Sequence, residues 1–397
     1  MATIDDAAVL AVLGQVAAPG AASPGHKAAS GPTDIASLGF VKDLAASSAG
    51  IKLRVEFPAP LTPARRAVET VSKAALSKAF PGVPVEVTIE GRIPSAFVGG
   101  EGTGPKKKVL ASGVKNFIAV GSGKGGVGKS TVAVNLAVGL ARAGARVGLL
   151  DADVYGPSVP LLTGVTREAF MEEMSMRAAQ GQLAAGGGEA PPPQLMAFEA
   201  LGLKVMSLGF VVEPEKAAIW RGPMVHNALQ TLLGEVNWGE LDYLVIDLPP
   251  GTGDVHLSLA QFVPLTGSVI VCTPQPVALA DARKALNLFQ STKTPVLGLV
   301  ENMSGHSCSK CGHVDDIFGT GGARDAAFEW QIPFLGSIPL STDVRHSGDR
   351  GRPLLADVDR PEDALSTACW GVVDRVTHVL GETVRARPRS LPIRRTP

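Results

Sequence analysis

The residues best suited to chemistry form a glycine-rich stretch at positions 123–131. It reads Gly-Lys-Gly-Gly-Val-Gly-Lys-Ser-Thr, the spacing of a P-loop. The glycines let successive backbone N–H groups point at phosphate oxygens, and the start of a following helix favours anions. Lys129 is expected to reach the β- and γ-phosphates of ATP, and Ser130 to ligate Mg²⁺. The residues expected to contact the nucleotide are Gly123, Lys124, Gly125, Gly126, Val127, Gly128, Lys129, Ser130 and Thr131.

Acidic residues follow two apolar runs further along the chain. Asp151 and Asp153 come after the first run, and Asp247 after the second. A carboxylate at the end of a buried strand beside a P-loop holds Mg²⁺ or its waters, which is the role expected for Asp247. We expect Asp151 to line the nucleotide site and Asp153 to position the attacking water. The N–H of Gly251 is expected to meet the γ-phosphate. Each aspartate could instead cap a helix.

Cys308 and Cys311 form a Cys-x-x-Cys pair in a polar loop. Four cysteines are too few for a disulfide framework in a chain this long, so the pair favours metal or redox chemistry. Two thiolates supply half of a four-thiolate centre. Zinc bound by the cysteines alone or with His306 and His313, a redox disulfide, and an ordinary loop remain open. The two other cysteines are expected to be core thiols: Cys272 and Cys369.

The elements that must position these residues form an α/β pattern from position 114 onward. Short apolar runs alternate with helical segments, which is typical of a doubly wound, mostly parallel sheet covered on both faces. The P-loop falls between the first run and a helix expected over 131–143, the context that the motif requires. The predicted strands are 117–120, 147–150, 204–208, 243–246, 268–272 and 296–300.

The chain ahead of the P-loop predicts a separate small α+β domain. Its helices are expected at 5–16 and 64–80 and its strands at 51–57 and 83–89, with a loop over 18–32. The predicted organisation is a first domain over 1–90, a linker over 91–112, a P-loop domain over 113–384 with a polar surface insertion at 166–193, and a disordered tail over 385–397. Lys106, Lys107 and Lys108 fit a solvated linker better than a nucleic-acid contact.

Composition narrows the class of protein. The 397 residues carry a formal net charge of zero, and 45% are hydrophobic. A basic excess typical of nucleic-acid binding is lacking, and no apolar run reaches the roughly 20 residues of a membrane span. The first residues do not resemble a secretory signal. We therefore expect no nucleic-acid or membrane partner and a cytoplasmic location, with an organellar matrix or stroma still open.

Several motifs together resemble the Mrp/NBP35 family of ATP-binding iron–sulfur cluster carriers. They are GKGGVGKST, DADVYGPS, RGPMV, DYLVIDLPPGTGD, TPQ and ENM, spread over residues 114 to about 380. The resemblance implies a homodimer around two nucleotides, with Lys124 crossing to the partner's nucleotide and Asn302 contacting the adenine. It also implies that Cys308 and Cys311 of two copies bridge one [4Fe–4S] cluster for apo iron–sulfur proteins. For Lys124, an ordinary solvated loop lysine is the alternative.

The first domain resembles a MIP18-type domain through the stretch 35–43. It lacks that family's Asp-Pro-Glu near the first helix. It also lacks the cysteine after the second strand, where the chain reads Phe57-Pro58-Ala59-Pro60. The departure from the family pattern therefore puts in doubt any cysteine-dependent role that the resemblance would imply for this domain.

The main functional prediction is a slow ATP hydrolase that assembles or transfers an iron–sulfur cluster. ATP binding would tighten the dimer through Lys124, and hydrolysis would relax the loops after Asp153 and Asp247. A MinD/ParA-type positioning ATPase with a structural zinc or a redox pair is the alternative. That class needs a membrane-targeting helix, which the proline-broken tail disfavours, or a DNA-binding surface, in which the cysteine pair has no purpose. A scaffold that binds ATP without turnover is a third possibility.

Overall fold

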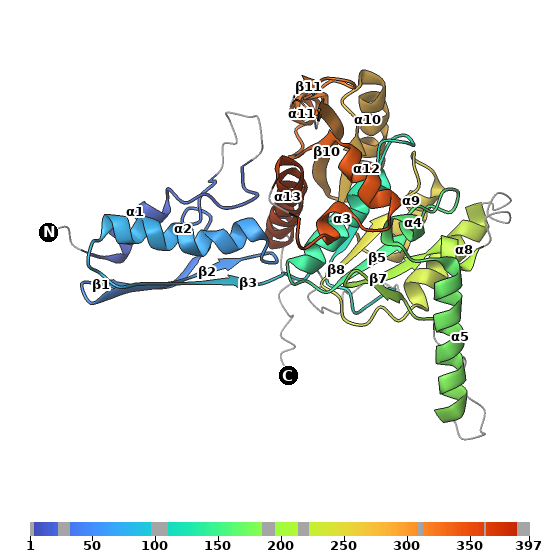
Figure 1. Ribbon diagram of the computed structural model, residues 1–397, viewed down its shortest axis with the longest axis horizontal. Coiled ribbons are helices and arrows are strands. Elements are labelled where there is room, and N and C mark those ends of the chain that lie inside the picture. The colour runs from blue at the N-terminus through green and yellow to red at the C-terminus, as the bar shows by residue number, and fades with distance from the viewer. Residues whose placement is uncertain are drawn as a thin grey trace, which may run out of the picture.

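The computed structural model describes residues 4–22, 32–96, 110–184, 195–212, 222–308, 311, 313–360 and 363–386. These residues form a three-stranded sheet near the start of the chain and a nine-stranded sheet in the remainder (Figure 1). Outside them lie Arg221 of the RGPMV motif, most of the predicted loop 18–32, most of the predicted linker with Lys106, Lys107 and Lys108, the second part of the predicted insertion, and the predicted tail beyond residue 386.

The small sheet is ordered β1-β2-β3, with two helices packed on it. Strand β2 buries alternate side chains, the pattern that predicts a strand there. It pairs antiparallel with β1 and parallel with β3, so α2 makes the crossover. Thr62 caps α2, and Pro63 occupies its first turn. The elements are α1 (Asp6–Leu13), β1 (Val41–Ser47), β2 (Gly50–Phe57), α2 (Pro63–Ala79) and β3 (Val85–Gly91).

The sequence pattern does not predict strand β1. None of its residues is fully buried, so its apolar positions do not alternate clearly. Its register against β2 also shifts between Lys42 and Ala45, where Asp43 has a positive φ of 49°. The strand exists because its neighbour β2 offers a free edge, which is information outside the segment itself.

The large sheet is ordered β11-β10-β9-β4-β8-β5-β7-β6, and β12 pairs with β10. Strands β4, β5, β8 and β9 are buried along their whole length, as expected for parallel strands covered on both faces. Among the described strands of this sheet, only the pairs β6–β7 and β10–β11 are antiparallel. The strands are β4 (Phe117–Gly121), β5 (Val147–Asp151), β6 (Phe198–Ala200), β7 (Leu203–Ser207), β8 (Tyr243–Asp247), β9 (Gly267–Cys272), β10 (Val296–Ser307), β11 (Val314–Asp315) and β12 (Phe334–Leu340).

Helices alternate with these strands, which confirms the predicted doubly wound α/β class. Helix α13 packs on β12 and on α3, the helix that follows the P-loop. The helices are α3 (Lys129–Arg142), α4 (Val159–Thr163), α5 (Arg167–Ala184), α6 (Leu208–Val211), α8 (Gly222–Gly234), α9 (Asp254–Phe262), α10 (Pro276–Ser291), α11 (Gly322–Glu329), α12 (Thr342–Asp349) and α13 (Ala364–Ala386), with a 3₁₀ turn at Leu354–Ala356.

Two segments differ from the pattern-based expectation. The first part of the predicted polar insertion forms the 18-residue helix α5, which projects from the body of the large sheet (Figure 1). Strand β10 continues beyond the predicted end at residue 300 to Ser307. The extension is polar and glycine-containing, so apolar patterning does not reveal it. It is stabilised instead by pairing with β11 and β12.

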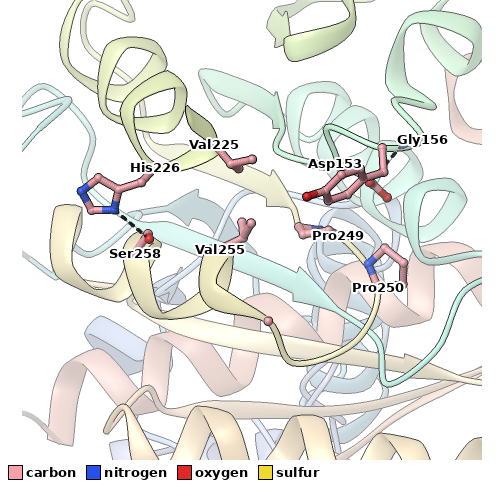
Figure 2. A pocket seen from close by; sticks show the side chains of 10 residues that line it. Asp153, Gly156, Val225, His226, Pro249, Pro250, Val255 and Ser258 are labelled. Atoms are coloured by element: carbon pink, nitrogen blue, oxygen red, sulfur yellow. Dashed lines mark hydrogen bonds between the residues drawn. The ribbon is translucent and has the colours of Figure 1, made fainter. Parts of the chain in front are cut away.

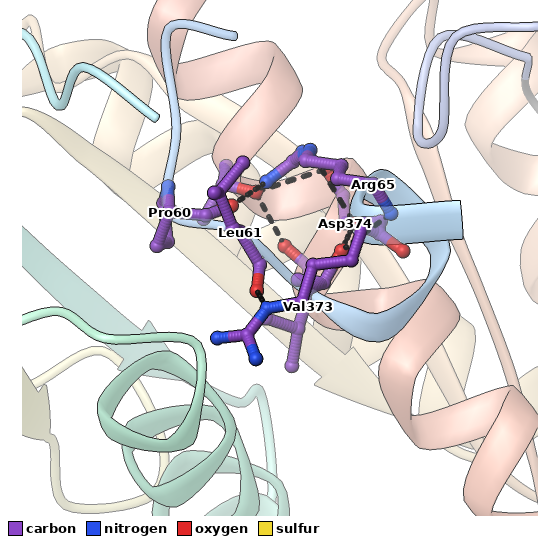
Figure 3. Close-up of polar contacts among 8 residues, drawn as sticks. Pro60, Leu61, Arg65, Val373 and Asp374 are labelled. Atoms are coloured by element: carbon purple, nitrogen blue, oxygen red, sulfur yellow. Dashed lines mark hydrogen bonds and ion pairs between the residues drawn. The ribbon is translucent and has the colours of Figure 1, made fainter. Parts of the chain in front are cut away.

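The small sheet unit packs on α13 through buried polar side chains (Figure 3). Arg65 is 1% exposed, and its Nη2 donates to the backbone oxygen of Asp374 and to Thr377 Oγ1, each at 2.9 Å. Its Nη1 donates to the Pro60 carbonyl at 2.9 Å. Thr62 Oγ1 donates to Asp374 Oδ1 at 2.6 Å. These bonds join the small unit to the last helix of the large one.

Glycines allow the two units to approach closely at this joint. A Cβ on Gly381 of α13 would lie 3.0 Å from the Pro58 carbonyl oxygen. A Cβ on Gly20, which has a φ of +89°, would lie 2.4 Å from the carbonyl oxygen of Asp374. At this joint the backbones of the two units therefore lie in close contact, in addition to the hydrogen bonds between their side chains.

Candidate nucleotide and cysteine sites

The P-loop connects the end of β4 to the start of α3. Gly126 and Gly128 have φ values of +80° and +79°, which only glycine adopts without strain. A Cβ on Gly123 would lie 2.1 Å from the backbone carbonyl of Asp281, and one on Gly128 would lie 2.1 Å from Asn302 Nδ2. The loop is thus held between α10 and β10 in a conformation suited to present N–H groups to an anion.

A cavity of about 380 Å³ opens above this loop. It brings together most of the predicted P-loop residues with Asp153, and Lys124 forms part of its wall. Thr131 and Ser130 line it from the first turn of α3. The predicted residues outside the lining are Gly123, Val127, Asp151, Asp247, Gly251 and Asn302.

Lys129 and Asp247 form a buried ion pair at the floor of the site. Lys129 Nζ lies 2.6 Å from Asp247 Oδ1 and 3.2 Å from Ser130 Oγ. Burial raises the pKa of Asp247, and the neighbouring Lys129 opposes that shift. Asp247 Oδ2 is buried and has no hydrogen-bond partner among the described residues. An oxygen of this kind beside Ser130 fits a site for Mg²⁺ or one of its waters.

Asp151 organises the loop after β5. Its carboxylate is fully buried and accepts from the N–H of Asp153 at 3.1 Å, from the N–H of Val159 at 3.1 Å and from Ser207 Oγ at 3.0 Å. Burial and the nearby charge of Asp247 raise the pKa of Asp151 to about 7. Because Val159 begins α4, Asp151 also serves the start of that helix.

A second cavity, of about 470 Å³, adjoins the first through Asp153, Gly156 and Pro250 (Figure 2). Asp153 is 7% exposed, and its Oδ1 accepts from the N–H of Gly156 at 3.2 Å. At the other end, His226 Nδ1 and Ser258 Oγ lie 2.8 Å apart (Figure 2). The sequence pattern does not single out either of these two residues, because each lies in an ordinary amphipathic helix. The site therefore has room beyond the expected γ-phosphate position.

Gly251 and Asn302 are engaged with the P-loop in this structure. The Gly251 N–H donates to the Ser122 carbonyl at 2.9 Å, so a contact with a γ-phosphate requires that bond to open. Asn302 is buried, and its Nδ2 donates to the Val127 carbonyl at 2.9 Å. Asn302 thus supports the loop from below, and its contact with adenine stays a prediction.

The cysteine pair lies at the end of the β10–β11 hairpin. The Cys308 N–H donates to the His313 carbonyl at 2.8 Å. Cys308 is half-buried and Cys311 is exposed. His306 Nδ1 lies 3.0 Å from the Leu340 carbonyl, and His313 Nε2 lies 3.1 Å from a carboxylate oxygen of Asp315. Across the described residues, no group of three or more His, Cys, Asp or Glu side chains is arranged to hold a metal. That Cys308 and Cys311 bind a metal centre stays a prediction.

The two remaining cysteines are core thiols, as predicted. Cys272 is 1% exposed and Cys369 is 4% exposed. Burial raises the pKa of Cys369 to about 12, and it also raises the pKa of Cys272.

Glu301 is a further buried residue for which the sequence predicts no role. Its carboxylate is fully buried and accepts from the N–H groups of Gly321 at 2.8 Å and Ala323 at 2.7 Å, and from Ser304 Oγ at 2.5 Å. The only sequence signal is an acidic residue directly after an apolar strand, the same signal that indicates Asp247. Its chain neighbour Asn302 bonds to the P-loop, and Glu301 itself bonds to the segments that flank the cysteine pair.

None of the helices described is long and apolar enough to cross a bilayer.

The parallel sheet, the P-loop after β4 and the paired Lys129–Asp247 define a P-loop NTPase. The family model for NUBPL iron-transfer P-loop NTPases (ParA) matches residues 113–377, and this chain belongs to that family. The resemblance to iron–sulfur cluster carriers drawn from the motifs is confirmed.

Similar proteins extend the match. An iron–sulfur cluster carrier protein of Salmonella typhimurium is 47% identical over 265 residues, 67% of each chain. One of Deinococcus radiodurans is 41% identical over 91% of this chain and 94% of its own. The iron–sulfur cluster transfer protein NUBPL of Dictyostelium discoideum is 46% identical over 64% of this chain and 74% of its own. An ADP complex of a nucleotide-binding protein from Archaeoglobus fulgidus aligns with a TM-score of 0.51 and 37% identity, over 64% of this chain and 96% of its own.

Proposed function

We propose that this chain is an ATP-hydrolysing carrier that receives a [4Fe–4S] cluster and delivers it to apo iron–sulfur proteins in the cytoplasm. The observation that carries the proposal is the position of Cys308 and Cys311. They lie in the loop that connects β10 to β11, and β10 also contacts the P-loop. They would supply two of the four thiolates that such a cluster requires. A second copy related by two-fold symmetry would supply the other two.

ATP would occupy the cavity above the P-loop. Lys129 would leave Asp247 Oδ1 for the β- and γ-phosphates. Ser130 would hold Mg²⁺, and Asp247 would hold the ion or one of its waters. When bound, Mg²⁺ neutralises phosphate charge. Lys124, which lines the same cavity, would reach the nucleotide of the second copy. ATP binding would thereby stabilise the homodimer.

Hydrolysis would depend on positioning and charge stabilisation rather than covalent chemistry, so turnover would be slow. Asp153 is the residue proposed to orient the attacking water, because its buried carboxylate reaches the cavity wall beside the P-loop. Opening of the Gly251–Ser122 bond would let the Gly251 N–H respond to the γ-phosphate. The named relatives are iron–sulfur carriers, which favours this function over a positioning ATPase.

Anaerobic reconstitution with iron and sulfide tests the cluster. We expect about four irons for every two chains and a visible absorption band, both lost in Cys308→Ala and Cys311→Ala. Cys272→Ala is the matched control, because that thiol is buried in the core and should leave the iron content unchanged. Stoichiometric zinc that resists replacement by iron would contradict the proposal.

Phosphate release tests the hydrolase. Asp153→Ala should lower the ATP turnover rate by about 100-fold with little change in ATP affinity, since the residue acts on the water. Asp359→Ala, an exposed carboxylate near the 3₁₀ turn, is the control. A wild-type chain that binds ATP and releases no phosphate above the level of Asp153→Ala would support the scaffold without turnover instead.

A further inference from the structure

Strand β10 carries two neighbouring polar side chains that each hold another part of the chain. Glu301 is fully buried and Asn302 is 6% exposed. Successive side chains of a strand point to opposite faces. Asn302 bonds to the P-loop at Val127, whereas Glu301 bonds to the segments on both sides of the cysteine pair. Two adjacent residues therefore connect the P-loop with the segments that flank the cysteine pair.

The Glu301 carboxylate links the two ends of the segment 304–321, which carries the cysteine pair. Ser304, which donates to it at 2.5 Å, precedes the pair, and Gly321, which donates at 2.8 Å, follows it. The same carboxylate accepts from Ala323 in the first turn of α11 at 2.7 Å. The Gly305 N–H adds a bond to the Gly319 carbonyl at 3.3 Å. Figure 1 shows β10, β11 and α11 gathered at one end of the large sheet.

The backbone between these two attachments is irregular. The β10–β12 register shifts between Asn302 and His306, and Met303 and Gly305 have positive φ values of 59° and 62°. Positive φ is costly for methionine, and such strain and bulges concentrate beside functional sites. A Cβ on Gly128 would meet both Asn302 Nδ2, at 2.1 Å, and Met303 Cε, at 3.7 Å. A change in the P-loop therefore reaches this bulge directly.

We propose that Glu301 is the positioning residue that transmits nucleotide binding at the P-loop to the cysteine pair. Phosphate binding that shifts the Val127 carbonyl moves Asn302, and Glu301 moves with it because the two share a peptide bond. The carboxylate then carries Ser304 and Gly321 along, which changes how Cys308 and Cys311 are presented. The inference rests on the proposed function, since it takes ATP at the P-loop and the cluster at the cysteines.

Thiol labelling of the cluster-free chain tests the coupling. The rate of reaction of Cys308 and Cys311 with a disulfide reagent is measured with and without a non-hydrolysable ATP analogue and Mg²⁺, and mass spectrometry assigns each label. Cys272 and Cys369 are buried and should react much more slowly. We expect the nucleotide to change the rate at the pair by at least about fivefold in the wild type.

Glu301→Gln should bring that ratio to about 1 while changing the affinity for the analogue by less than about threefold. The amide keeps the size of the side chain, but its NH2 group must face one of the two N–H groups that the carboxylate now accepts from, those of Gly321 and Ala323, so one of these bonds is lost. Ser304→Ala removes a single bond and should reduce the ratio partway, so it keeps the test decisive if Glu301→Gln does not fold. Asp363→Asn is the matched control, because that carboxylate accepts from Ser366 N–H at the start of α13 at 2.7 Å and lies off this route.

A wild-type ratio in folded Glu301→Gln or Ser304→Ala would overturn the inference, as would a wild type whose labelling ignores the nucleotide. Failure of the proposed function looks different. In that case the wild-type chain binds no ATP analogue or takes up no iron on reconstitution. If the wild-type chain binds the ATP analogue and takes up iron, but Glu301→Gln keeps the wild-type labelling ratio, only the role of Glu301 is refuted.

Discussion

Two buried ion pairs lie in different parts of the molecule and are built differently. Arg65 and Asp374 join the small unit to α13, and Lys129 and Asp247 lie under the phosphate cavity. All four side chains are at most 6% exposed. Both terminal nitrogens of Arg65 donate hydrogen bonds, and Asp374 also accepts from Thr62. Arg65 Nε makes no hydrogen bond among the described residues, but it lies 3.5 Å from Asp374 Oδ1. By contrast, one oxygen of Asp247 has no partner among the described residues.

This difference in hydrogen bonding is what we expect between a structural interface and a ligand-binding site. Burial raises the pKa of both Asp374 and Asp247, and the paired cation opposes the shift in each case. At the interface with α13, four hydrogen bonds hold the two charged side chains, and the remaining Arg65 nitrogen faces the Asp374 carboxylate. Leaving a carboxylate oxygen unpaired in the interior costs free energy. At the P-loop, the proposed Mg²⁺ ion or one of its waters would supply the missing contact.

The largest expected effect comes from breaking the joint. Arg65→Met should lower the free energy of unfolding by about 3–5 kcal/mol, because it leaves the Asp374 carboxylate buried without its cation. Urea denaturation measures the loss. The double variant Arg65→Met/Asp374→Leu removes both charges and should be more stable than the single one. A loss below about 1 kcal/mol in Arg65→Met would mean that the pair behaves like an exposed one.

Removing the cation at the P-loop should affect activity more than stability. Lys129→Ala is expected to lower phosphate release by about 100- to 1000-fold, because the lysine stabilises the transferring phosphate. The pKa of Asp247 would then rise further, because Lys129 no longer opposes the effect of burial. Lys284→Ala, which breaks the exposed pair with Asp281, is the control and should keep full turnover. A Lys129→Ala chain that hydrolyses ATP normally would contradict this assignment.

Backbone contact at the joint is open to a finer test. Gly20→Ala should cost about 2 kcal/mol of unfolding free energy, because the added Cβ meets the Asp374 carbonyl and φ is positive. Gly39→Ala is the matched control, since it has a positive φ of +66° and no atom within 4 Å of the added Cβ. Equal losses in thermal melts of the two variants would show that the contact with Asp374 adds nothing.

The smallest expected effect concerns His256, near the P-loop. It is 4% exposed, and burial lowers its pKa to about 4. The unfolded chain therefore binds more protons than the folded one below about pH 6.5, so this contribution to stability is full above that pH and is lost as the pH falls toward 4. Relative to His256→Phe, the wild type should lose roughly 1 kcal/mol between pH 7 and pH 5.5. An unchanged difference across that range would refute the assignment.

Local patterns account for much of the nucleotide site. The P-loop, the strands ending at Asp151 and Asp247, and the core thiols follow from spacing and apolar runs. The joint could not be predicted in this way, because Arg65 and Asp374 are 309 positions apart. The role of Glu301 was equally hidden. Its partners come from β10 itself and from the segment entering α11, and only the fold brings them to one carboxylate.

Cluster transfer tests the central claim most directly. The reconstituted chain is mixed, without oxygen, with an apo-enzyme that needs a [4Fe–4S] cluster, and the recovery of the acceptor's activity is followed with and without ATP and Mg²⁺. The account predicts transfer from the wild type, a rate that depends on ATP, and no transfer from Cys308→Ala/Cys311→Ala. Equal recovery from that double variant, or a cluster that never leaves the wild-type chain, would contradict it.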